Sequence, residues 1–129
     1  MVFNRTNSVE QVGKSAVYKG EKRAVFASYL IRFRIKKEMA KPVLLCSYIN
    51  SSFGRAYILS NITKAIGQVN INAQIIGQLP IPLPPLEEQE QIVDRLNWAE
   101  EIKKTNAESD KKIEELKSSL LQRAFRGEL

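Results

Sequence analysis

The chain has 129 residues, of which 43% are hydrophobic and 26% are charged, so it can hold one modest core or a small globular unit with one extended element. This composition excludes a disordered or membrane-embedded protein, and no apolar run approaches the ~20 residues of a membrane-spanning helix. The single cysteine, Cys46, excludes an internal disulfide, and its apolar neighbours favour a reduced residue in the core. We therefore expect a cytoplasmic protein.

The charge is distributed unevenly along the chain. Residues 1–78 contain 12 Lys and Arg against 3 Asp and Glu, a net charge of +9, whereas residues 79–129 contain 8 against 11, a net charge of −3. A basic globular part followed by a charge-balanced part is typical of a nucleic-acid-binding protein with a separate protein-contact element. Charge alone does not establish this function, because many proteins are basic without such a partner.

Residues 23–36, RAVFASYLIRFRIK, alternate between apolar and polar side chains along much of their length. This period of two predicts one strand. Its core face would carry Val25, Ala27, Tyr29, Ile31, Phe33 and Ile35, and its other face Ser28, Arg32, Arg34 and Lys36. The basic face is either a surface for an acidic partner or an ordinary solvated sheet face.

Short helices are expected between residues 42 and 78. Pro42 favours a helix start, because the N–H that proline lacks has no partner in the first turn. Gly54 is expected to separate this helix from a second one that carries Tyr57, Ile58 and Ile62. Asn70 or Asn72 offers an N-cap for a third helix, which Gly77 would end. A strand and short helices in this order predict an α+β fold class.

Four of the five prolines lie in the segment LPIPLPP, residues 79–85. Proline locks its own φ and pushes the preceding residue into an extended conformation, so this segment is predicted to form a rigid edge strand or an extended strut. Pro85 can serve as the first residue of the following helix, where Glu87, Glu88 and Glu90 suit the helix dipole. We expect residues 80–85 to be a stiff junction that fixes the angle between a globular part and that helix.

One long helix is predicted from about Leu86 to Phe125, which at 1.5 Å per residue is about 60 Å long. Residues at coiled-coil spacing form a narrow stripe along it, named here the seam: Ile92, Leu96, Ala99, Ile102, Asn106, Ser109, Ile113, Leu116 and Leu120. The polar residues Asn106 and Ser109 lower the stability of pairing and can fix its register. A lone helix with so narrow a stripe is marginal, so we predict that it pairs, as an antiparallel homodimer, through residues 86–125.

Two motifs at the ends of this helix resemble those of a known family. PIPLPPLEEQEQIVDRL, at residues 80–96, and LKSSLLQRAFRGEL, at 116–129, resemble the proline-rich junction and helix end of the specificity subunit of type I restriction-modification systems. FNRTNSVEQVGKSAVY, at 3–18, is similar to the middle of a target recognition domain of this family, and QVNINAQIIGQLPIPLPP, at 68–85, to its final part. The resemblance covers essentially the whole chain but only part of a subunit, which in this family has two recognition domains and two spacer helices.

The resemblance implies a domain organisation and a division of labour. Residues 1–79 correspond to the C-terminal portion of a target recognition domain, 80–85 to the junction, and 86–129 to a spacer and dimerisation helix. The domain would read one half of a bipartite site in double-stranded DNA, and the helix would dock antiparallel against a second spacer helix, from another copy or a second half-subunit.

The chemistry of this family is expected on partner subunits. The resemblance implies two modification subunits, which bind S-adenosylmethionine and methylate adenine, and a motor-nuclease subunit. This chain is expected to be non-catalytic and to hold no cofactor or metal. The residues agree, because the sequence contains no His, no Walker-type phosphate loop, no Asn/Asp-Pro-Pro-aromatic motif and no metal-ligand cluster.

Side chains suited to DNA contacts lie near the start of the chain. Lys and Arg bind phosphates, whereas Arg, Asn, Gln, Ser and Thr reach base edges. The loop-like segment NRTNS and the cations after it supply the candidates: Asn4, Arg5, Thr6, Asn7, Ser8, Lys14, Lys19, Lys22 and Arg23. For each of them, an exposed polar residue without a DNA partner is the competing interpretation.

Two other functions stay open at this point. A truncated oligomerisation scaffold would pair through the helix without binding DNA specifically. A single-chain restriction-methylation enzyme would need catalytic motifs that this sequence lacks. A steep salt dependence of DNA binding would distinguish a phosphate-binding surface from a scaffold.

Overall fold

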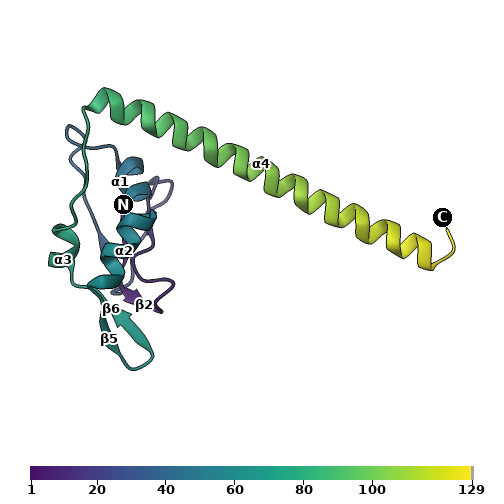
Figure 1. Ribbon diagram of the computed structural model, residues 1–129, viewed down its shortest axis with the longest axis horizontal. Helices are drawn as coiled ribbons and strands as arrows, with labels where there is room; N and C mark the ends of the chain where they lie inside the picture. Colours follow the sequence, from purple (N-terminus) through teal and green to yellow (C-terminus); the bar gives the residue numbers. More distant parts are fainter. Residues whose placement is uncertain (129) are drawn as a thin grey trace. The chain divides into compact units, whose positions relative to one another are not determined.

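The computed structural model describes residues 1–128, which form two compact units (Figure 1). The first, Met1–Val93, is called unit 1; the second begins at Asp94 and continues the last helix. In chain order the elements are β1 (Val2–Asn4), β2 (Thr6–Asn7), β3 (Ser15–Ala16), β4 (Leu30–Arg32), α1 (Pro42–Asn50), α2 (Ser52–Ser60), β5 (Thr63–Ala65), β6 (Gln68–Asn70), α3 (Ala73–Gly77) and α4 (Leu86–Phe125). The predicted α+β fold class is confirmed.

Unit 1 contains two small antiparallel sheets joined by one run of backbone, residues 2–7. In the first sheet β1 lies between β3 and β4, and in the second β6 lies between β2 and β5. The chain passes from one sheet to the other at Arg5. The N–H of Arg5 donates to the Tyr29 carbonyl oxygen at 2.9 Å, and its carbonyl oxygen accepts from the Ile71 N–H at 3.0 Å.

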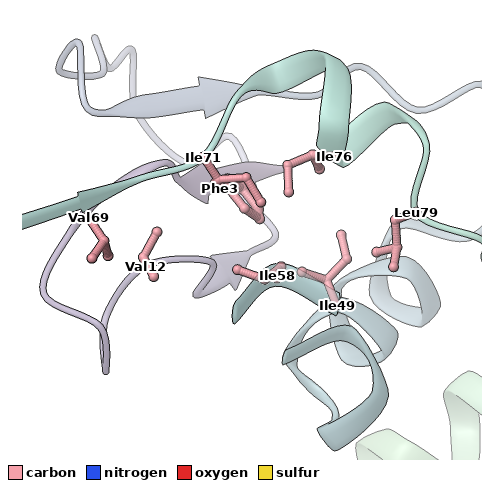
Figure 2. Close-up of a cluster of buried hydrophobic side chains, with 8 residues drawn as sticks. All are labelled: Phe3, Val12, Ile49, Ile58, Val69, Ile71, Ile76 and Leu79. Carbon is pink, nitrogen blue, oxygen red and sulfur yellow. The ribbon is translucent and has the colours of Figure 1, made fainter. Parts of the chain in front are cut away.

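The core of unit 1 lies where both sheets meet the short helices. Ile49 of α1 and Ile58 of α2 point toward the residues contributed by the strands and loops (Figure 2). The cluster consists of Phe3, Val12, Ile49, Ile58, Val69, Ile71, Ile76 and Leu79, each less than 9% exposed. Phe33 packs edge-on against Phe3, with ring centroids 6.0 Å apart. Burying such aliphatic and aromatic side chains contributes about 1.5–3 kcal/mol each, so this cluster is the main source of stability in unit 1.

The predicted strand over residues 23–36 is largely wrong. Only Leu30–Arg32 forms a strand, and its partner β1 is equally short. The alternation holds after that point, where Ile31 and Phe33 are half-buried and Arg32, Arg34 and Lys36 are exposed. Before it, Val25 is 99% exposed and Tyr29 is 50% exposed, so neither faces the core. An alternating pattern needs a partner strand for its N–H and C=O groups, and no described strand pairs with residues 23–28.

The break between α1 and α2 lies at Ser51 and not at Gly54. Pro42 begins α1 as predicted. Ser51 is the N-cap of α2, where its hydroxyl oxygen accepts from the Gly54 N–H at 3.4 Å. Gly54 lies inside α2, where a Cβ atom would be 2.5 Å from the carbonyl oxygens of Tyr48 and Ile49. Glycine is therefore required here because the two helices approach closely, and not because the helix is interrupted.

The other predicted helix signals have mixed outcomes. Asn72 caps α3 by accepting from the Gln74 N–H at 2.9 Å, and α3 ends at Gly77, as predicted. Ile62 lies beyond the end of α2, so its placement on that helix was wrong.

The long helix α4 has the predicted bounds, Leu86–Phe125. This interval contains no Pro or Gly, and Glu87 and Glu88 at its start and Arg123 at its end suit the helix dipole. Pro85 precedes the helix instead of beginning it, and its carbonyl oxygen accepts from the Gln89 N–H at 3.0 Å. The described residues 79–85 form no strand, which excludes the edge-strand form of the proline segment.

None of the helices among the described residues combines the length and the apolar character that crossing a membrane requires.

Gly54→Ala is expected to destabilise unit 1 by about 1–3 kcal/mol, because the added methyl group meets backbone that can move only if α1 and α2 separate. Gly77→Ala is the matched control, since nothing lies within 4 Å of a Cβ atom at that helical glycine. Urea denaturation followed by the NMR signals of Ile58 and Ile71 measures both variants. Equal stability of the two variants would contradict the close approach of α1 and α2.

Candidate functional site

The turn between β2 and β3 is held against α2 by Arg55. The Arg55 guanidinium donates to the carbonyl oxygen of Val9 at 3.0 Å and also to that of Val12. Gly13 follows with a φ of +84°, in the left-handed region that favours glycine, and a Cβ atom there would lie 2.8 Å from Cδ1 of Ile58. Two N–H groups of Arg55 are therefore engaged in holding this turn.

Asn50, at the end of α1, holds Ser15, which follows the turn between β2 and β3 that Arg55 contacts. The Asn50 carboxamide accepts from the Ser15 N–H and donates to the Ser15 carbonyl oxygen, both at 2.9 Å, as a neighbouring strand would. A hollow of about 370 Å³ lies beside this contact, lined by Lys14, Ser15, Asn50 and Arg55. Lys14 and Arg55 both bring positive charge to this hollow, and the backbone contacts of Arg55 use two of its five N–H groups.

The segment NRTNS, predicted to be loop-like, belongs mostly to strands: Asn4 ends β1, and Thr6 and Asn7 form β2. The Thr6 hydroxyl oxygen accepts from Nδ2 of Asn70 at 2.7 Å, and Oδ1 of Asn7 accepts from the Ser8 N–H at 2.9 Å. Oδ1 of Asn4 is buried and has no hydrogen-bond partner within residues 1–128. Several of these polar side chains therefore have a local structural role, and their contact with DNA stays a prediction.

The candidate cations lie in two places. Lys14 is adjacent to NRTNS, since the Asn4 N–H donates to the Lys14 carbonyl oxygen at 3.0 Å. Lys19, Lys22 and Arg23 are exposed in the irregular segment between β3 and β4. Within residues 1–128 no hydrogen bond joins these three residues to NRTNS, and their contact with DNA stays a prediction.

The β5–β6 hairpin was not predicted from the sequence, although it pairs directly with β2. The hairpin and the turn after β2 line a hollow of about 410 Å³. Its lining residues are Ser8, Val9, Glu10, Lys64, Ala65, Gly67, Gln68 and Val69. A hydrogen bond from the Ser8 side chain is the main cause that lowers the pKa of Glu10, so this carboxylate is ionised at neutral pH. The signal was present in the sequence as two short polar runs around Gly67, whose φ is +76°.

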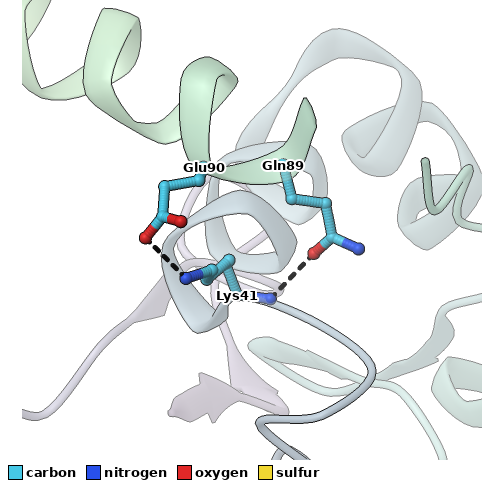
Figure 3. A network of polar contacts seen from close by, with 3 residues as sticks. All are labelled: Lys41, Gln89 and Glu90. Carbon is cyan, nitrogen blue, oxygen red and sulfur yellow. Dashed lines mark hydrogen bonds and ion pairs between the residues drawn. The ribbon is translucent and has the colours of Figure 1, made fainter. Parts of the chain in front are cut away.

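The start of α4 is attached to unit 1 through Gln89, whose side chain is 1% exposed. Oε1 of Gln89 accepts from the Lys41 N–H at 2.9 Å, as Figure 3 shows. Nε2 donates to the carbonyl oxygens of Met39 at 3.1 Å and Pro84 at 2.8 Å. One side chain of α4 thus binds both the residues before α1 and the proline segment.

An ion pair lies beside this carboxamide. Nζ of Lys41 and Oε1 of Glu90 are 2.8 Å apart, but their side chains are 34% and 64% exposed (Figure 3). Such pairs contribute about 0–1 kcal/mol, whereas leaving buried amide partners unpaired costs about 1–3 kcal/mol. Gln89 is therefore the dominant contact between the start of α4 and the rest of unit 1, although nothing in the sequence distinguishes it from the neighbouring acidic residues.

The seam of α4 is largely exposed. Ile102 is 40% exposed, Ile113 60%, Leu116 61% and Leu120 43%, whereas Ile92 and Leu96 near unit 1 are half-buried. The Ser109 hydroxyl donates to the Thr105 carbonyl oxygen at 3.0 Å, inside its own helix. The helix also exposes large apolar residues that the sequence reasoning left out of the seam: Trp98, Leu121 and Phe125.

Metal-ligating and thiol groups among the described residues can be assessed directly. The described residues contain no group of three or more His, Cys, Asp or Glu residues that could hold a metal ion. Burial raises the pKa of the Cys46 thiol, which keeps it protonated at neutral pH and unsuited to nucleophilic attack.

Comparison with known proteins gives a family for this combination of a small basic unit and a long exposed helix. A family model described as type I restriction modification DNA specificity domain matches residues 5–118, from the start of β2 to within the last turns of α4. The chain belongs to this family. No solved structure matches this specificity domain.

Relatives of this specificity domain include named specificity subunits. The chain is 31% identical over 134 residues to the StySPI specificity subunit, a type I restriction enzyme subunit of Salmonella potsdam. The match covers 100% of this chain and 29% of the relative. The chain is 30% identical over 136 residues to the EcoKI specificity subunit of Escherichia coli K12, again with 100% and 29% covered. The specificity domain described here therefore spans less than a third of the length of these two relatives.

Proposed function

We propose that this chain is a DNA-recognition component of a type I restriction-modification system, in which unit 1 reads one half of a bipartite site in double-stranded DNA. The observation that carries the proposal is the unneutralised positive charge of residues 1–78. Of the 12 Lys and Arg residues there, Lys41 is the one that forms an ion pair within the described chain. Such a charge excess attracts phosphates, and membership of the specificity-domain family supports DNA as their source.

In this proposal α4 is the spacer helix. Its exposed seam would pair antiparallel with a second spacer helix, from another copy of the chain or from a second half-subunit, and the pair would set the distance between the two DNA half-sites. The relatives' identity as subunits of type I restriction enzymes supports assembly with modification subunits and a motor-nuclease subunit. S-adenosylmethionine would bind to the modification subunits, and this chain would take no part in methyl transfer or cleavage.

DNA binding by the complete chain is expected to weaken steeply as salt increases, because each phosphate contact contributes about 0.9 to the slope of log K against log salt. Lys22→Ala should weaken binding to all duplexes alike and reduce that slope by about 1. Lys112→Ala on α4, an equally exposed lysine, should leave the slope unchanged. Fluorescence anisotropy with labelled duplex measures both. A binding constant that does not respond to salt would favour the oligomerisation scaffold instead.

Self-association through the seam is expected to be visible by analytical ultracentrifugation. Leu120→Lys places a charge in the seam and should shift the chain toward monomer, whereas Leu121→Lys, at the neighbouring position outside the seam, should not. The two leucines are matched, being 43% and 50% exposed on the same helix turn. A wild-type chain that stays monomeric at high micromolar concentration would refute pairing with a second copy.

A further inference from the structure

The register of the β2–β6–β5 sheet assigns its side chains to two faces. In antiparallel sheets, residues directly opposite each other lie on the same face, and so do residues two apart along a strand. Asn70 is opposite Thr6 on one side and Thr63 on the other, and Gln68 is opposite Ala65. Thr6, Thr63, Gln68, Asn70 and Ala65 therefore share one face.

The opposite face of this sheet points toward the core. It carries Val69, which is 4% exposed, with Asn7 and Lys64 as its cross-strand neighbours. The face with Thr6, Thr63, Gln68 and Asn70 is consequently the outward one, and is named here the polar face. Its members are exposed or half-buried.

The polar face is distinctive because it carries no charge, although residues 1–78 have a net charge of +9. The strand β4 and the residues after it expose Arg32, Arg34 and Lys36 instead. Two carboxamides and two hydroxyls are the groups that read base edges: Asn and Gln form paired hydrogen bonds with adenine, and Thr reaches several bases. Contacts to phosphates, which carry no sequence information, come largely from Lys and Arg, and the polar face has neither.

The side chains of the polar face are available to a partner to different degrees. Nδ2 of Asn70 donates to Oγ1 of Thr6 at 2.7 Å, which orients both groups. Within residues 1–128 no hydrogen bond engages the Gln68 carboxamide, and Gln68 is exposed. Gln68 can therefore offer both its donor and its acceptor, while Asn70 keeps its acceptor.

The β5–β6 hairpin is accessible to a duplex. It forms one end of unit 1, beyond α2 (Figure 1). Ile66 and Gly67 make the two-residue turn, and Ile66 is 104% exposed. A β-ribbon of this kind fits the major groove of B-DNA, where each base pair presents a distinct pattern of donors and acceptors.

We propose that the polar face of the β2–β6–β5 sheet reads base edges in the major groove, with Gln68 as the main specificity-determining side chain and Asn70 oriented by Thr6. This inference rests on the proposed function, since it names the part of unit 1 that would supply sequence preference. It keeps Thr6 from the nine predicted candidates and adds Thr63, Gln68 and Asn70 through strand pairing.

NMR titration of the complete ¹⁵N-labelled chain with duplex DNA at low salt tests the location of the surface. The side-chain amide signals of Gln68 and Asn70 are expected to shift, and that of Gln74 on α3 is expected not to. Shifts at Lys19, Lys22 and Arg23 without shifts at Gln68 and Asn70 would overturn the polar face and leave the proposed function intact. No shift anywhere would overturn both.

Selection of duplexes from a randomised pool tests specificity. Gln68→Ala is expected to lose preference for one base pair by roughly 5- to 150-fold, with little change in binding to unselected DNA. Gln74→Ala, an exposed glutamine outside the sheet, should keep the wild-type preference. A Gln68→Ala chain that selects the same sites as wild type, or a wild-type chain that selects none, would overturn the inference.

Discussion

The buried carboxamide of Gln89 connects the beginning of the long helix to the body of unit 1. It is hydrogen-bonded to the Lys41 N–H and to the carbonyl oxygens of Met39 and Pro84, all in partly buried contacts. The proline segment depends on such side chains, because four of its seven residues have no N–H to donate to a ladder. The Tyr48 hydroxyl performs a similar task by donating to the Pro80 carbonyl oxygen at 3.0 Å. The stiffness of LPIPLPP thus comes from proline, but its position in unit 1 comes from hydrogen bonds with α1 and α4.

The polar face and the first turns of α4 belong to the same compact unit. The polar face belongs to a sheet that reaches the core through Val69 and Ile71, and the same core includes Ile49 of α1 and Leu79 at the start of the proline segment. The first turns of α4, up to Val93, belong to unit 1 with them. A helix that begins inside unit 1 needs no flexible linker, which agrees with a sequence that uses proline and not glycine and serine at the junction.

Features of the fold that depend only on residues close together in the sequence, such as helix ends, could be predicted from the sequence. Pro42, the side-chain cap Asn72 and the interval without Pro or Gly from Leu86 to Phe125 fix helix ends through local interactions, and those ends were predicted correctly. The predicted strand over residues 23–36 failed because a strand also requires a partner, and β1 offers three residues only. The polar face and Gln89 could not be found in this way, because Thr6 and Asn70 are 64 positions apart and Gln89 and Lys41 are 48 apart. Gly54 was noticed but misread, since a helix contact and a helix break both require glycine.

Native-state hydrogen exchange measures most directly whether Gln89 makes the start of α4 part of unit 1. Gln89→Ala is expected to lower the protection of the Ile92 and Val93 amides, and of Leu45 in α1, by about 1–3 kcal/mol, the cost of leaving buried partners unpaired. Gln91→Ala, an exposed glutamine on the same helix, should leave the protection of these amides unchanged. Equal protection in the two variants would contradict the account, because the first turns of α4 would then open independently of Gln89.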